Sequence, residues 1–312
     1  MEILKSNKSG FRQYLESKGL AKRTITYYLK GVGYFFNYTK KEDIQVIKPD
    51  VLKYLEYLKN KGVENVTRKN NLIALKHYFA FLCEEEQITQ NPCWQLKIRG
   101  ANKKRLYKIY TPEELTQLAD NFYTLFVSGF ADGNRLSETQ KKKSFLSRHR
   151  NYTMLTFMLY QGLPTAELPL INISDIDLNK AKLTINNRMA TRTLPIQATQ
   201  IGTLIHYINS IRPQFLDFCG ETEKLFFSLS ADQYDKTFSK PLRKLTKQVK
   251  SIDRNFINFS QTRTSVISHW IQTEGLRKAQ YLAGHKNIKS TENYIQNNLE
   301  NLIDDINKLH PF

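Results

Sequence analysis

The feature that most constrains the fold is a basic stretch, poor in apolar residues, that follows the first ninety residues. Asn91-Pro92 ends a run of regularly spaced apolar residues, and the next segment is rich in cations. These cations are Lys97, Arg99, Lys103, Lys104, Arg105 and Lys108. Thr111 then provides an N-cap, with Pro112 in the first turn and Glu114 three residues on, which is a strong helix start. The sequence therefore predicts a first domain at 1–95, a basic linker at 96–110 and a second domain at 111–312.

The first domain has the apolar spacing of four short helices. Apolar residues recur at helical intervals on both sides of Gly19, which predicts two helices. A third helix follows Pro49, with Asp50 placed to cap it, and a fourth runs from about residue 66 to 85. Four helices with polar connections predict a small all-α domain.

The second domain is predicted to be mostly helical with one small sheet. Ile171, Ile173 and Ile176 alternate like a strand, and further strands are expected around 183–185 and 192–196. The segments before and after this region have helical patterns. The predicted fold class is mainly α, with a four-helix N-terminal domain and a mixed, mostly helical α/β domain.

The charge balance indicates a polyanionic partner. The chain has 47 Lys and Arg against 29 Asp and Glu, a net charge of +18, and its first 110 residues hold 22 of those cations but only 10 of the acids. Such an excess is typical of nucleic-acid binding, because each phosphate contact releases condensed counterions. The candidate DNA-binding residues are Lys22, Arg23, Arg68, Lys69, Lys103, Lys104 and Arg105.

Several other protein classes are excluded by the sequence. No uncharged apolar run approaches the ~20 residues that span a bilayer, and the first residues lack the apolar stretch of a signal peptide, so we expect a cytoplasmic protein without a membrane partner. Cys83, Cys93 and Cys219 are widely spaced without a C-x-x-C pair, so we expect neither a disulfide framework nor a structural metal. Walker A, H-E-x-x-H and nucleophile-elbow motifs are absent from the sequence.

Three motifs in the last fifty residues carry the chemistry. Arg263-Thr264-Ser265-Val266-Ile267-Ser268-His269 lies on a predicted helix, Leu282-Ala283-Gly284-His285 ends a helix, and Tyr294 stands nine residues after that histidine. Their order and spacing resemble the R-H-S-x-A-T-H, L-G-H and T-x-x-x-Y motifs of the tyrosine recombinase, or phage-type integrase, family. The segments QGLPTAEL and TRTLPI and the four-helix front domain also resemble parts of that family, so the resemblance covers nearly the whole chain.

The resemblance implies cutting and rejoining of DNA through a 3′-phosphotyrosine intermediate, without metal or cofactor. Tyr294 would attack the phosphodiester, Arg263 would donate two N–H groups to the scissile phosphate, and His285 would donate a hydrogen bond to it. It further implies a core-binding first domain, a C-shaped clamp around double-stranded DNA, and a dimer to tetramer of the chain on DNA. The apolar stripe at 298–312 would then pack on a neighbouring subunit.

The chain departs from the family pattern at three places. Pro164 stands where the family has its first arginine, and Ser260 stands where it has histidine, lysine or tyrosine. The hairpin near 186–188 lacks the lysine that acts as general acid in the family. Arg188 and Arg192 are the candidates to supply a compensating cation, although arginine is a poor proton donor.

Two functions therefore remain open at the level of sequence. One is a site-specific recombinase or integrase that uses Tyr294, Arg263, His285 and Ser260. The alternative is a catalytically degenerate relative that binds DNA, or partners an active recombinase, without cleavage. An RNA-binding protein would need stacking aromatics on a sheet, and the predicted β content is small. A cation near Arg263, from among residues 148, 150, 188 and 192, would favour the enzyme.

Overall fold

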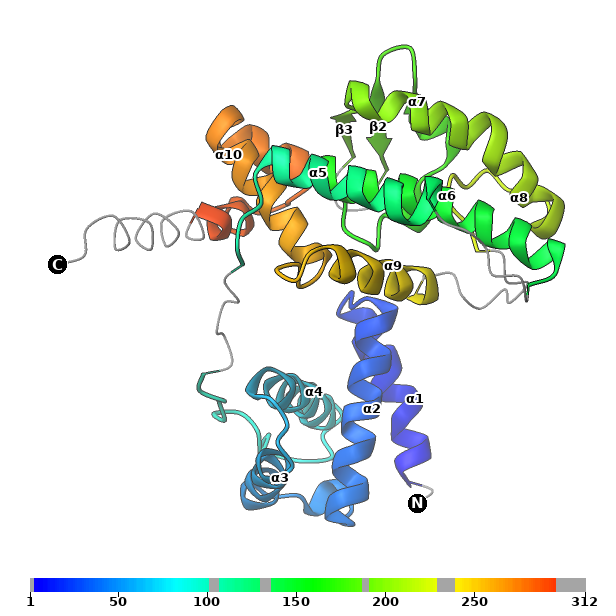
Figure 1. Ribbon diagram of the computed structural model, residues 1–312. Coiled ribbons are helices and arrows are strands. Elements are labelled where there is room, and N and C mark those ends of the chain that lie inside the picture. Colours follow the sequence, from blue (N-terminus) through cyan, green and yellow to red (C-terminus); the bar gives the residue numbers. More distant parts are fainter. Residues whose placement is uncertain (1–2, 101–106, 130–135, 187–190, 229–238, 296–312) are drawn as a thin grey trace. The chain divides into compact units, whose positions relative to one another are not determined.

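The computed structural model describes residues 3–100, 107–129, 136–186, 191–228 and 239–295. The chain divides into two compact units, which we call unit 1 (Met1–Arg105) and unit 2 (Leu106–Phe312). Each unit has its own cluster of buried apolar residues, and the elements of each are drawn in Figure 1.

Within residues 3–100, unit 1 contains four α-helices and one short 3₁₀ turn at Asp43–Gln45. The helices are α1 (Ile3–Ser17), α2 (Lys22–Thr39), α3 (Lys48–Asn60) and α4 (Asn65–Glu84). Helix α3 begins at Lys48, earlier than predicted, so Asp50 caps it from the first turn and Ile47 is the N-cap residue. Asp50 lies in the first turn and its carboxylate accepts the backbone N–H of Ile47 at 3.0 Å. Pro49 is tolerated there because first-turn N–H groups have no partner within the helix.

The core of unit 1 is largely aromatic. Phe35 packs edge-on against Tyr54 with ring centroids 5.2 Å apart, and Phe36 packs against Tyr78 at 5.4 Å. The hydroxyl of Tyr78 donates to the buried carboxylate of Asp43 at 2.8 Å, which satisfies both polar groups. Burial and the Asp43 charge together raise the pKa of Tyr78. These contacts join α2, α3, α4 and the 3₁₀ turn into one helical unit.

Unit 2 is helical with one small sheet. Its helices are α5 (Pro112–Tyr123), α6 (Glu138–Tyr160), α7 (Ala198–His206), α8 (Arg212–Cys219), α9 (Ser239–Ile252) and α10 (Phe259–Ala283), and residues 288–295 are also helical. The predicted capping box at the start of α5 is confirmed: Thr111 Oγ1 accepts the N–H of Glu114 at 3.2 Å, and Glu114 accepts that of Thr111 at 2.9 Å. Short π-helical turns at Thr124–Ser128 and Tyr207–Ile211 extend α5 and link α7 to α8.

The sheet has three antiparallel strands in the order β1 (Ile176–Asp177), β2 (Lys182–Ile185) and β3 (Arg192–Pro195). In Figure 1, β2 and β3 lie beside α7. The predicted strand at 171–176 is mostly wrong, because 3₁₀ turns occupy Leu168–Leu170 and Ile173–Asp175. The Asp175 carboxylate accepts the N–H of Asn172 at 2.8 Å and closes the second turn. The predicted fold class, mainly helical with one small sheet, is nevertheless confirmed.

Two further properties concern the described ranges only. None of their helices combines the length and the apolarity that crossing a membrane requires. Likewise, no three of their His, Cys, Asp and Glu side chains are grouped closely enough to hold a metal ion.

Candidate active site

Arg263 lies in the second turn of α10 and contacts two backbone carbonyls. Its Nη1 donates to Gly162 O at 2.6 Å and its Nη2 to Ala283 O at 2.7 Å. Arg263 and Ala283 are twenty residues apart, which would be about 30 Å in a straight helix. The bend at Gly275, with φ 79° and ψ 163°, interrupts α10 and allows this contact. The carbonyls hold the half-buried guanidinium in a fixed orientation.

His285 follows the end of α10 and joins Arg263 through its ring. Gly284 ends the helix in the left-handed region at φ 69°, and the Nε2 atom of His285 then lies 3.4 Å from Arg263 Nη2. The Nδ1 atom lies 3.0 Å from the hydroxyl of the buried Thr291. Because a guanidinium can only donate, Nε2 accepts in this contact, so the proton is assigned to Nδ1.

The electrostatics agree with a neutral His285. Burial, together with the positive charges of Arg263 and Arg192, lowers the pKa of His285 to about 4. Burial also lowers the pKa of Arg263, an effect that Tyr294 and Glu167 partly offset. Arginine remains charged despite such a shift, so the pair presents one fixed cation and one neutral imidazole near neutral pH.

Tyr294 lies in the helical segment 288–295 and contacts both of these residues. Its ring stacks on that of His285, with centroids 5.6 Å apart and planes 16° from parallel. Tyr294 also interacts electrostatically with Arg263 and offsets part of the lowering of the arginine pKa. The structure thus brings together three of the four residues that the sequence singles out as catalytic.

Arg192 lies directly beneath the turn that carries His285. It is 1% exposed, and its Nη2 and Nη1 atoms donate to the carboxylate of Glu167 at 2.6 and 3.1 Å. Its Nε donates to Leu282 O at 2.8 Å. A Cβ atom added to Gly284 would lie 2.6 Å from Arg192 Nη1, so only glycine fits above this guanidinium. Glu167 was not singled out from the sequence, although it occupies the glutamate position of the QGLPTAEL segment.

Two other candidate cations, Arg150 and Arg148 of α6, form hydrogen bonds with groups other than the Arg263 cluster. Arg150, 3% exposed, donates to Phe227 O at 2.8 Å and to the side chain of Asn151. Arg148, 7% exposed, donates to Ser144 Oγ at 2.9 Å. Arg188 lies outside the described residues.

Ser260 and Pro164 share a pocket with Arg263. The pocket has a volume of about 500 Å³ and also receives side chains from α9 and from Asn258, the N-cap of α10. Three of these α9 residues are cations, Arg243, Lys247 and Lys250, and none of the described lining residues is acidic. Their spacing at i, i+4 and i+7 could have been recognised in the sequence as one helix face.

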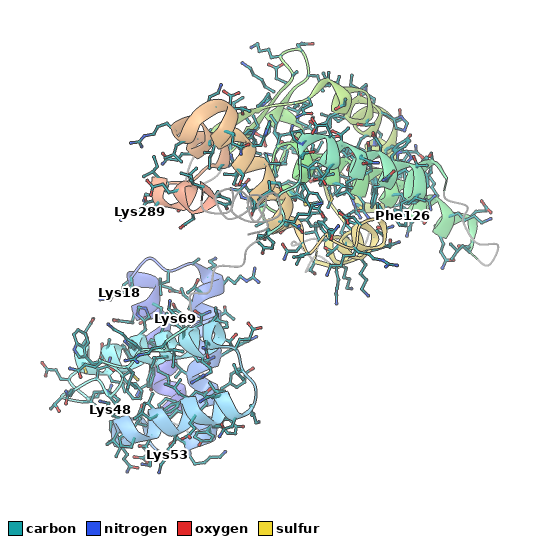
Figure 2. The ribbon with its side chains drawn as sticks, turned by 60° about the vertical axis from the view of Figure 1, so that its left-hand side comes forward. Lys18, Lys48, Lys53, Lys69, Phe126 and Lys289 are labelled. Carbon is teal, nitrogen blue, oxygen red and sulfur yellow. The ribbon has the colours of Figure 1, made fainter. Side chains whose placement is uncertain are left out.

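The candidate DNA-binding residues of unit 1 lie on two helices. Lys22 and Arg23 are exposed at the start of α2, and Arg68 and Lys69 are half-buried in the first turns of α4, where Figure 2 labels Lys69. The Nη1 atom of Arg68 donates to Asn65 Oδ1 at 3.0 Å. The linker residues 103–105 lie outside the described ranges.

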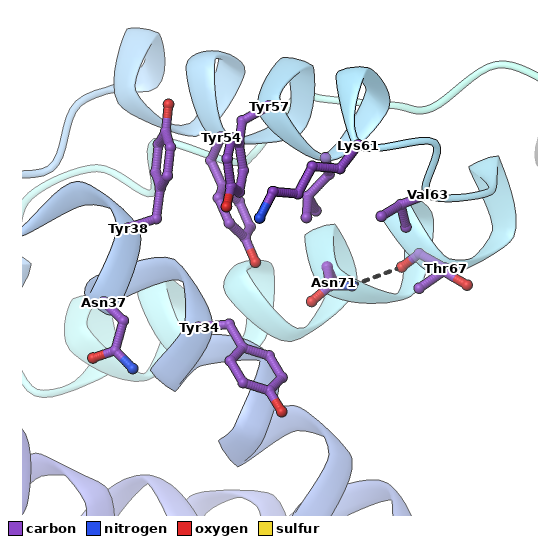
Figure 3. A pocket seen from close by; sticks show the side chains of 10 residues that line it. Tyr34, Asn37, Tyr38, Tyr54, Tyr57, Lys61, Val63, Thr67 and Asn71 are labelled. Atoms are coloured by element: carbon purple, nitrogen blue, oxygen red, sulfur yellow. Dashed lines mark hydrogen bonds between the residues drawn. The ribbon is translucent and has the colours of Figure 1, made fainter.

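A second pocket, of about 630 Å³, lies in unit 1 between α2, α3 and the start of α4 (Figure 3). Tyr34, Tyr38, Tyr54 and Tyr57 supply most of its aromatic wall, and Lys61 Nζ lies 4.6 Å from the centroid of the Tyr57 ring. Its described lining has one cation and neither histidine nor carboxylate. The arrangement therefore offers no acid–base pair comparable to that in unit 2.

Comparison with known proteins places this geometry in a family. Residues 131–301 match the Phage integrase family, and residues 9–86 match the phage integrase N-terminal SAM-like domain. The chain is 24% identical over 320 residues to tyrosine recombinase XerC of Pelotomaculum thermopropionicum, covering 96% of each protein. It is 26% identical over 306 residues to tyrosine recombinase XerA of Pyrococcus horikoshii, covering 96% of this chain and 91% of the relative.

Solved structures share the fold. The Tn1549 transposon integrase, in complex with a circular intermediate DNA, superposes with a TM-score of 0.63 at 14% identity, covering 92% of this chain and 94% of that one. A lambda integrase dimer bound to a COC′ core site gives a TM-score of 0.62 at 14% identity, covering 93% and 94%. Since the family match extends over more than half of the sequence, the chain belongs to the phage integrase family.

Proposed function

We propose that the protein is a site-specific DNA recombinase that cuts and rejoins DNA through a 3′-phosphotyrosine on Tyr294. The observation that carries this proposal is the cluster of Tyr294, Arg263 and His285, in which the tyrosine contacts both partners. A nucleophile next to a fixed cation is the arrangement that transfer of a phosphoryl group requires.

The chemical step is a transesterification. The Tyr294 oxygen forms a bond to phosphorus while the bond from phosphorus to the 5′ oxygen breaks; the tyrosine proton is lost, and a proton is delivered to the departing oxygen. The ester is conserved, so religation by another 5′ hydroxyl needs no external energy source. Arg263, held by two carbonyls, donates to the non-bridging oxygens as negative charge develops.

His285 supports this step by a change of hydrogen bonding. Without DNA its Nε2 accepts from Arg263. We propose that Nε2 carries a proton and donates to the phosphate once DNA is bound, as the family resemblance implies. Arg192 then acts as a positioning residue, because its hydrogen bonds to Glu167 and Leu282 support the turn before His285.

We further propose that the DNA is double-stranded and that two to four copies of the chain assemble on it in the cytoplasm. The solved integrases include a lambda integrase dimer on a core site and a lambda integrase tetramer on a Holliday junction, which supports this assembly. Lys22, Arg23, Arg68 and Lys69 of unit 1 and Lys103, Lys104 and Arg105 of the linker would contact phosphates.

Denaturing capture on a DNA fragment library tests the proposal without knowledge of the target site. Tagged protein is incubated with the library, denatured and recovered, and any attached DNA is sequenced. Wild type should retain fragments that share a sequence, and Tyr294→Phe should retain none. A wild type that binds DNA tightly but retains no more than Tyr294→Phe would instead support the degenerate, non-cleaving relative.

A further inference from the structure

The proposed chemistry lacks one cation at the position where the family resemblance expects it. Pro164 has neither charge nor a donor, and the α6 residues Arg148 and Arg150 donate to Ser144 Oγ and Phe227 O. Arg263 is then the one family arginine left to neutralise the non-bridging oxygens in the transition state, with His285 as a second, uncharged donor. Removing one preorganised charge contact typically costs ~10² to 10³ in rate.

The pocket beside Pro164 contains cations from a different element. Arg243, Lys247 and Lys250 of α9 line the same pocket as Pro164, Ser260 and Arg263. Within the described ranges, none of the three α9 side chains forms an ion pair with a carboxylate. The described lining of the pocket thus contains four positive side chains and no acidic one.

Helix α9 is held in place by its buried side, so the backbone positions of these three cations are fixed. Leu245 and Val249 lie on its opposite side, are fully buried and belong to the apolar core of unit 2. The helix packs against α5 and α6, as its position beneath them in Figure 1 also shows. Arg243, Lys247 and Lys250 are exposed, which leaves them able to receive a phosphate.

We infer that the basic face of α9, formed by Arg243, Lys247 and Lys250, binds the scissile phosphodiester together with Arg263 and replaces the arginine lost at Pro164. The inference rests on the proposed function and adds to it the residues that hold the substrate phosphate. Lysine suits this role as a compact charge with three donors, whereas the fork of Arg263 fixes orientation.

The first test compares variants within one helix. Lys247→Gln/Lys250→Gln should lower the rate of phosphotyrosine formation at saturating DNA by about 100-fold or more. Lys244→Gln is the matched control, because Lys244 is exposed on α9 but does not line the pocket. Equal rates for the double variant and the control, at the same melting temperature, would overturn the inference while leaving the proposed function intact.

A second test identifies which phosphate the lysines contact. A methylphosphonate at the cleavage position has no negative charge, so the double variant should lose little further rate on that substrate. Installing Pro164→Arg in the double variant should recover a large part of the lost rate on ordinary DNA. If the double variant lowers the rate by the same factor on the methylphosphonate substrate as on ordinary DNA, the lysines act on a different phosphate. That result would overturn the inference.

If wild type forms no adduct with any DNA, the proposed function is contradicted. The pocket is then tested only by its contribution to DNA affinity. The triple variant Arg243→Gln/Lys247→Gln/Lys250→Gln should then reduce the slope of log K against log salt by about 1 relative to Lys244→Gln, because the three side chains neutralise one phosphate. An unchanged slope would remove the pocket as a phosphate site.

Discussion

The guanidinium of Arg192 and the carboxylate of Glu167 form a buried two-point ion pair, with N–O distances of 2.6 and 3.1 Å. Because Arg192 also donates to Leu282 O, the pair links strand β3 and the loop after α6 to the turn that presents His285. The histidine is thereby positioned by residues that do not need to touch DNA.

Breaking this pair should destabilise unit 2 strongly. Glu167→Gln leaves a buried guanidinium without its counter-charge, so the free energy of unfolding should fall by about 3–5 kcal/mol. Lys278→Gln is the control: it removes an exposed ion pair with Glu274 and should cost at most about 1 kcal/mol. Urea denaturation measures both, and equal values for the two variants would contradict the positioning role.

A second prediction concerns the glycine above Arg192. Gly284→Ala combines a left-handed φ of 69° with a Cβ atom 2.6 Å from Arg192 Nη1, so the melting temperature and the rate of adduct formation should both fall. Gly202→Ala is the matched control, since Gly202 is in α7 with no atom within 4 Å of the added Cβ. That control should be neutral or stabilising by up to about 1 kcal/mol. Equal melting temperatures for the two variants would count against the close packing at Gly284.

The sequence motifs singled out Arg263, His285 and Tyr294, and the structure brings these three residues together because their spacing along the chain reflects local structure. Arg263 and His285 lie close to the two ends of α10, and Tyr294 follows nine residues after His285. The capping residues and glycines that mark such helix ends can be recognised in a sequence. The strand expected at Ile171 and Ile173 was wrong because Asp175 closes a 3₁₀ turn by a side-chain hydrogen bond, which alternation of apolar residues does not reveal.

Contacts distant along the chain could not be read in the same way. Arg192 was expected to be a candidate phosphate ligand, but its partner Glu167 lies twenty-five residues away and the pair is buried. The basic face of α9 has a helical period in the sequence, yet its place beside Pro164 depends on how α9 and α10 pack. Both the burial of the Arg192–Glu167 pair and the position of the basic face of α9 therefore depend on tertiary packing.

Stability should decrease as the pH falls from about 6.5 towards about 4. Burial and nearby cations lower the pKa of His285 to about 4, and burial with His206 and Arg148 lowers that of His149 to about 4. The unfolded chain, with ordinary histidine pKa values near 6.5, binds more protons in this window, so stability rises with pH there.

Melting temperatures at about pH 7 and about pH 5 test this sign. Wild type should have a lower melting temperature at the acid pH, and His149→Gln should show a smaller decrease because one of the histidines with a lowered pKa is removed. If the melting temperature of the variant decreases by as much as that of wild type, His149 does not contribute to the pH dependence.

DNA affinity should depend steeply on salt. If about 6 phosphates are neutralised, the slope of log K against log salt should be about −5. Lys22→Gln/Arg23→Gln should reduce the slope by about 2 on every DNA sequence, because contacts to the backbone carry no base information. Lys59→Gln, exposed on α3, is the control and should leave the slope unchanged. A salt-independent affinity would exclude the electrostatic contacts assigned to unit 1.

The most direct measurement is the identity of the residue that bonds to DNA. Adducts formed on nicked substrates, in which the departing strand diffuses away, are digested with protease and nuclease and analysed by mass spectrometry. We predict a nucleotide linked through its 3′ phosphate to the peptide that contains Tyr294, and no such peptide from Tyr294→Phe. An adduct on another residue, or none from wild type on tightly bound DNA, would contradict this prediction.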